Sequence, residues 1–67
     1  MDYIQQMSQW AEKGDVRASL FLGLAYLYGI EEVFPYPEEA KYWLSKAAMK
    51  DPAFFEKNWE LKEFIND

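Results

Sequence analysis

The side chains that could do chemistry in this chain are almost all carboxylates. The sequence has 12 Asp and Glu residues but no His and no Cys, which removes the commonest general base and every thiolate ligand. The adjacent pair Glu38 and Glu39 suggests acid–base work or a hard metal ion. Neighbouring residues on a helix diverge by about 100°, however, so the pair does not converge on one ion. Because the sequence also lacks a phosphate-binding glycine loop and a nucleophile elbow, we expect no catalytic residue, no metal site and no cofactor.

Four acidic residues near the end of the chain follow helical spacing and predict an acidic stripe on one helix: Glu56, Glu60, Glu63 and Asp67. Like charges at this spacing oppose helix formation by about 0.2–0.5 kcal/mol per pair. The stripe could imitate phosphate charge toward a basic partner protein. The alternative is an ordinary solvated outer face, with Lys57 and Lys62 nearby.

A second candidate surface combines aromatic rings with one cation. At about 100° per residue, one side of the second helix carries these residues: Arg17, Phe21, Leu24 and Tyr28. Such a composition is enriched at protein–protein hot spots. The alternative is that the apolar members pack on the first and last helices. Arg17 and Tyr28 are the better candidates for exposure, because each has a polar end.

The loop at about residues 30–37 is the third candidate. It places carboxylates beside aromatic rings, and the residues that could contact a partner are Glu31, Glu32, Phe34 and Tyr36. Its prolines reduce the entropy lost when such a loop is ordered on a partner. The alternative is that Phe34 and Tyr36 lie under the core while the glutamates are solvated.

Four antiparallel helices are expected to position these residues, at about 2–13, 15–29, 37–50 and 52–65. The start and stop signals are N-cap aspartates, glycines at helix ends and prolines at first helical positions: Asp2, Asp15, Asp51, Gly14, Gly29, Pro37 and Pro52. The second helix is apolar almost all round and should be central. Large aromatic side chains, among them Trp10, Trp43 and Trp59, are expected to anchor the small core.

Small residues at helical spacing recur from Ala11 to Ala48. The motif comprises Ala18, Leu22-Gly23, Tyr26 and Gly29, followed by Ala40, Trp43-Leu44 and Lys46-Ala47-Ala48. It resembles the Sel1-like repeat, a relative of the tetratricopeptide repeat. A shift of 37 residues aligns Ala11 with Ala48, which suggests one full repeat between two half-repeats. The resemblance implies an all-α fold, an α–α superhelix in which the first helix of each repeat lines the ligand-binding face.

Composition limits the partners of this single 67-residue domain. A net charge of −5 disfavours direct binding to nucleic-acid backbones and to anionic membrane surfaces. The N-terminal residues lack the pattern of a signal peptide, and the apolar run 18–30 is too short to span a bilayer. We therefore expect a cytoplasmic protein.

The leading functional hypothesis is a non-enzymatic protein–protein interaction module, a small stand-alone acidic binder that blocks or modulates one partner protein. Small acidic inhibitors and immunity proteins of bacteria, phages and mobile elements fit this description by analogy. The alternative is a structural role, as a self-associating repeat unit or as a fragment of a longer scaffold. A monomer or a weak homo-oligomer is compatible with these hypotheses.

Overall fold

Five α-helices form the fold in the computed structural model, which describes residues 3–66. They are α1 (Tyr3–Glu12), α2 (Val16–Tyr28), α3 (Pro37–Lys50), α4 (Pro52–Lys57) and α5 (Trp59–Asn66). The expected all-α class is confirmed, and no strand occurs in the described part. Over the same residues, no helix combines the length and apolarity needed to cross a bilayer.

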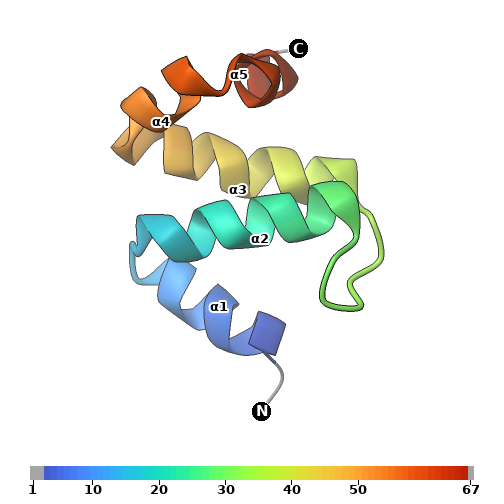
Figure 1. Cartoon of the computed structure of the whole chain (residues 1–67). Helices are drawn as coiled ribbons and strands as arrows, with labels where there is room; N and C mark the ends of the chain where they lie inside the picture. The colour runs from blue at the N-terminus through green and yellow to red at the C-terminus, as the bar shows by residue number, and fades with distance from the viewer. Residues whose placement is uncertain (1–2, 67) are drawn as a thin grey trace.

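The helices pack in the order in which the chain visits them (Figure 1). Helix α1 lies against α2, α2 lies antiparallel to α3, and both α4 and α5 lie on α3. Within residues 3–66, α1 contacts neither α4 nor α5. The α2–α3 hairpin is thus a central layer with one helical layer on either side.

Local signals set the ends of the first three helices. The Asp15 carboxylate accepts hydrogen bonds from the backbone N–H groups of Arg17 at 2.9 Å and Ala18 at 3.2 Å, so it caps α2 as expected. Gly29 ends α2 in the left-handed conformation, with φ 70°. Pro37 begins α3. The expected cap Asp2 lies outside the described residues.

Helices α2 and α3 approach closely at Gly23. A Cβ atom built on Gly23 would lie 2.5 Å from the Leu44 Cγ atom and 3.2 Å from the Leu44 backbone nitrogen. Gly23 is buried, and Leu44 is completely buried. The close packing expected from the small-residue motif is therefore present, and a larger side chain at Gly23 would have to separate the two helices.

Two apolar clusters form the core. The first joins α1, α2 and α3, through Met7, Ala11, Ala18, Leu22 and Trp43. The second joins α3, α4 and α5, through Leu44, Ala47, Phe55 and Leu61. The expectation that three tryptophans anchor the core holds for Trp43 alone, since Trp10 is 46% and Trp59 64% exposed. Both lie on terminal helices, which have a neighbour on one side only.

The expected fourth helix, 52–65, is wrong as a single element. It breaks at Asn58, whose side-chain Nδ2 donates to the Phe54 carbonyl at 2.8 Å and whose carbonyl accepts from Leu61 at 3.0 Å. Phe55 and Leu61 would point about 120° apart on a continuous helix. The break lets both side chains enter the second cluster, and their burial is a physical reason for it.

Substitution of Gly23 by Leu tests the close approach of α2 and α3. Overpacking against Leu44 should lower the free energy of unfolding by about 1–3 kcal/mol or more. In a domain of this size, each kcal/mol lowers Tm by about 4–8 °C. Thermal unfolding followed by circular dichroism measures the change.

Met49→Leu is the matched control, because Met49 is 85% exposed on α3 and should tolerate the same new side chain. An unchanged Tm for Gly23→Leu would contradict the close contact.

Candidate protein-binding surface

The loop between α2 and α3 contains an unusual turn. Glu31 and Glu32 have φ values of 57° and 60°, and the Val33 N–H donates to the Ile30 carbonyl at 3.1 Å. Two left-handed central residues closed by such a hydrogen bond are the features of a type I′ turn. This turn normally takes Asn-Gly or Gly-Gly, so the Glu-Glu sequence offered no local signal for it.

The loop backbone is held at both ends. The N–H groups of Gly29 and Ile30 donate to the Ala25 carbonyl, at 2.7 and 3.2 Å. On the return side, the Tyr36 N–H donates to the Tyr26 carbonyl at 2.8 Å. Pro35 packs tightly on the helix end, since a Cβ on Gly29 would lie 2.8 Å from its Cγ atom. The loop therefore has a defined path rather than a free one.

Aromatic side chains of this loop project into solvent. Phe34 is 84% exposed and Tyr36 is 53% exposed, so the alternative that both lie under the core is wrong. Half-buried Val33 takes the inward position instead, where it lines a depression together with Ile4 of α1. At the adjoining end of α2, Tyr28 is 65% exposed, so the structure brings one α2 candidate next to the loop candidates.

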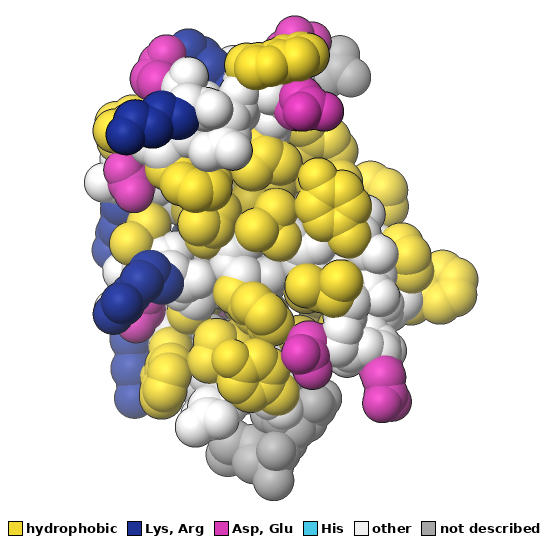
Figure 2. Space-filling view, viewed as in Figure 1, with side chains coloured by type: hydrophobic (Ala, Val, Ile, Leu, Met, Phe, Trp, Pro, Cys, Tyr) yellow, Lys and Arg dark blue, Asp and Glu magenta, His cyan; other side chains and the backbone are white. Residues whose placement is uncertain are grey.

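Negative charge is concentrated around the same aromatic residues. Residues 28–39, hereafter the acidic aromatic loop, contain four glutamates and no Lys or Arg, a net charge of −4 against −5 for the whole chain. All four are exposed: Glu31, Glu32, Glu38 and Glu39. In the view of Figure 2, Lys and Arg gather along the opposite, left edge, and hydrophobic side chains cover the middle of the face. The loop end of the hairpin thus carries most of the net negative charge of the chain.

The remaining candidate residues on α2 differ in how far their side chains are buried. Phe21 is half-buried, with its ring edge-on to Tyr3 at 5.2 Å between centroids. Leu24 is half-buried against the second cluster. Packing on the neighbouring helices, the alternative interpretation, therefore describes these two residues, while Arg17 is exposed.

Arg17 and Phe21 lie on a groove between α1 and α2. The groove has a volume of about 240 Å³, and its other lining residues are Tyr3, Met7, Trp10, Asp15 and Ala18. Trp10 was expected to anchor the core, yet Trp10 and Tyr3 are both nearly half exposed. Both rings lie on one side of an amphipathic terminal helix, which has no second neighbour to cover them. This pattern is the sequence signal that could have indicated their partial exposure.

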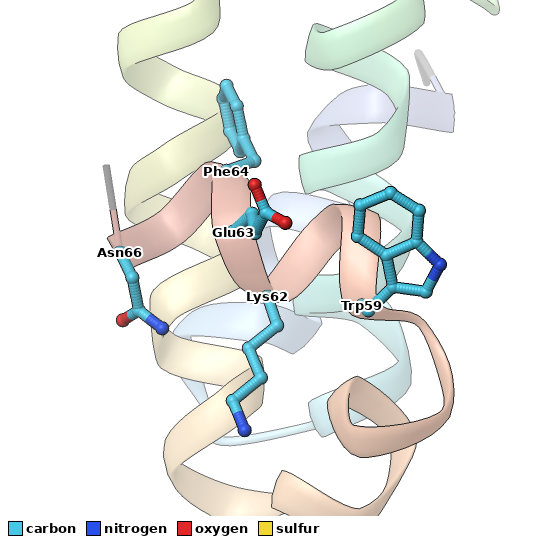
Figure 3. A pocket seen from close by; sticks show the side chains of 5 residues that line it. All are labelled: Trp59, Lys62, Glu63, Phe64 and Asn66. Carbon is cyan, nitrogen blue, oxygen red and sulfur yellow. The ribbon is translucent and has the colours of Figure 1, made fainter.

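The acidic candidates of the last segment do not form one stripe. Glu56 belongs to α4, where its carboxylate pairs with the Lys62 amine at 2.8 Å, whereas Glu60 and Glu63 belong to α5. The break at Asn58 separates them, and Asp67 lies outside the described residues. Five side chains line one depression on α5, and Figure 3 shows the Glu63 carboxylate between the rings of Trp59 and Phe64. The side chains of Lys62 and Asn66 point away from these rings.

In the described part of the chain, no group of three or more His, Cys, Asp or Glu residues is placed so that it could hold a metal ion. The surfaces described above offer rings and charges for contact.

Comparisons with protein-family models, with curated proteins and with solved structures gave no match. The resemblance to the Sel1-like repeat therefore stays a prediction from the motif. Helices that pack in chain order are compatible with it.

Replacement of Glu31 by Asn and Glu32 by Gly tests the strain in the turn. Residues with a Cβ atom pay about 1–2 kcal/mol each for the left-handed conformation, and Asn-Gly suits a type I′ turn. The double variant should raise the free energy of unfolding by about 1–2 kcal/mol, measured in urea.

The matched control is Glu31→Gln with Glu32→Gln, which removes the same charges but keeps two ordinary side chains. If the control stabilises the protein as much as Asn-Gly does, charge repulsion rather than backbone strain is the cause.

Proposed function

We propose that this chain is a non-enzymatic protein-binding module that blocks or modulates a partner protein through the acidic aromatic loop. The observation that carries the proposal is Phe34, which is 84% exposed at the loop between two tightly packed helices. Complete removal of a phenylalanine side chain from water stabilises a fold or a complex by about 1.5–3 kcal/mol. Phe34 contributes little of this to folding, so most of its apolar area is available to a partner.

The loop is suited to binding because its backbone is already ordered. Hydrogen bonds from Tyr36 to Tyr26 and from Val33 to Ile30 hold the segment on either side of Phe34. A partner would therefore lose little affinity to ordering of the loop. Tyr28 and Tyr36 flank Phe34 with aromatic area and a hydroxyl each, the residue type that is enriched in hot spots.

The negative charge of the loop limits the kind of partner surface that it can bind. Four exposed glutamates surround the aromatic residues and would repel an acidic surface. We propose a partner protein with an apolar pocket for Phe34 inside a rim of Lys and Arg. Opposite charges at the rim would accelerate encounter and exclude other surfaces, while the buried ring would supply most of the affinity.

The proposal includes the repeat architecture. In a Sel1-like arrangement, α2 and α3 would form the full repeat, and α1 and the α4–α5 pair would be the flanking halves. The acidic aromatic loop then stands where the family has a glycine-rich turn. Inhibitors and immunity proteins remain the nearest analogy for so small an acidic binder.

Capture of the partner from the native host by the full chain tests the proposal. Phe34→Ser should reduce the captured protein at least about tenfold, as expected for a hot-spot residue. Met49→Ser is the matched control, since Met49 is equally exposed at 85% but lies on α3 away from the loop. Circular dichroism should show the same helix content in all three proteins.

Two further variants locate the contact. Tyr28→Ala should weaken capture, whereas Arg17→Ala, at the other end of α2, should leave it unchanged. Retained capture by Phe34→Ser, or a loss with Arg17→Ala alone, would overturn the assignment to the loop.

A further inference from the structure

The joint between α4 and α5 interrupts a segment whose sequence favours one continuous helix. Residues 52–66 contain no Gly, and Pro occurs only at the first position. Four residues recur at i, i+4, i+7 and i+11 and would share one side of such a helix: Phe54, Asn58, Leu61 and Ile65. The three apolar members already belong to the second cluster or pack against it, so a straight helix would keep their contacts.

The bend adds one buried ring to the cluster. Phe55 is 3% exposed, yet on a straight helix it would be about 100° away from Phe54 and about 120° away from Leu61. The bend also has a cost, because the first N–H groups of α5 lack the carbonyl partners that a continuous helix supplies. Burial of one ring is thus balanced against the backbone hydrogen bonds of one helical turn.

Two polar side-chain contacts hold the bend. Asn58 Nδ2 donates to the Phe54 carbonyl at 2.8 Å, whereas in a continuous helix this carbonyl accepts from the backbone N–H of Asn58. The Lys62 amine pairs with the Glu56 carboxylate at 2.8 Å. Residues six apart are about 240° around a continuous helix and about 9 Å along it, so the straight form would lose this ion pair.

The straight helix offers the two ions no replacement for each other. No carboxylate stands three or four residues from Lys62 in the sequence. Glu56 would lie one turn before Glu60, where like charges oppose helix formation, and Lys57 offsets part of this repulsion. Both members of the pair are exposed, with side-chain values of 45% and 65%, so salt weakens their attraction. Raised ionic strength therefore favours the straight form.

We propose that the α4–α5 joint is a salt-sensitive switch between the bent form and one continuous helix over residues 52–66. In the straight form the other apolar side chains stay on the second cluster, while Phe55 turns into solvent. Phe55 then lies one turn before Trp59, which is already 64% exposed, and residues at i and i+4 are neighbours on a helix. The switch thus uncovers a pair of rings, independently of the function proposed for the acidic aromatic loop.

A distance between two spin labels on the full chain tests this inference. The sequence has no Cys, so labels on Ala53→Cys and Asn66→Cys, two exposed positions, report on the joint alone. On a straight helix the two Cα atoms are about 20 Å apart, and the bend brings them closer. Between about 0.1 and 1 M NaCl, the ratio of the longer to the shorter distance should rise about two- to fivefold, the effect of one exposed ion pair. Electron paramagnetic resonance measures both distances.

Three variants of the labelled protein separate the contacts. Glu56→Gln should raise the ratio at low salt about two- to fivefold and remove most of the salt response. Lys57→Gln is the matched control, because it removes a neighbouring exposed charge that is not part of the pair, and it should not raise the ratio. Asn58→Leu removes the hydrogen bond to Phe54 and completes the apolar series, so the ratio should rise about tenfold.

The inference is overturned if the labelled protein without further changes shows only the shorter distance at both salt concentrations. The same holds if Asn58→Leu retains the shorter distance alone while circular dichroism shows that its helices are intact. A salt response that survives Glu56→Gln would overturn the role assigned to the ion pair.

Discussion

The contact between Gly23 and Leu44 is the constraint on which the rest of the structure depends. It brings the backbones of α2 and α3 close enough to form a hairpin with small residues at its centre. Among residues 3–66, it is the hairpin that contributes to both apolar clusters. Helix α1 and the α4–α5 pair are attached to its two sides, so a change in the spacing between α2 and α3 would disturb both clusters.

Closure of this hairpin also explains the loop. The chain must reverse between Tyr28 and Pro37 to bring α3 back along α2, and it does so through two left-handed glutamates. Hydrogen bonds at both ends hold the loop backbone in this path. Such surrounding contacts allow a folded protein to keep residues in a strained conformation. The same path directs Val33 inward and leaves Phe34 in solvent. The ordered loop and its exposed ring are thus two results of one geometric requirement.

A chain of 67 residues cannot cover all of its aromatic side chains with only three helical layers. Trp43, on the inner side of the central hairpin, is covered, while Tyr42 on the outer side of α3 and the rings on terminal helices or in the loop keep an open side. The uncovered rings do not form one patch. They lie at the acidic end of the hairpin, in the α1–α2 groove, on the outer side of α3 and on α5.

The sequence by itself determined the all-α class and the bounds of α1, α2 and α3, because caps, glycines and prolines act within one helical turn. It also indicated Arg17 and Tyr28 as exposed, since their polar ends favour water. Only the tertiary structure decided the break at Asn58, the exposure of Phe34 and the groove lined by Tyr3 and Trp10. These depend on which neighbour covers each side chain, and that is set by packing between segments distant in the chain.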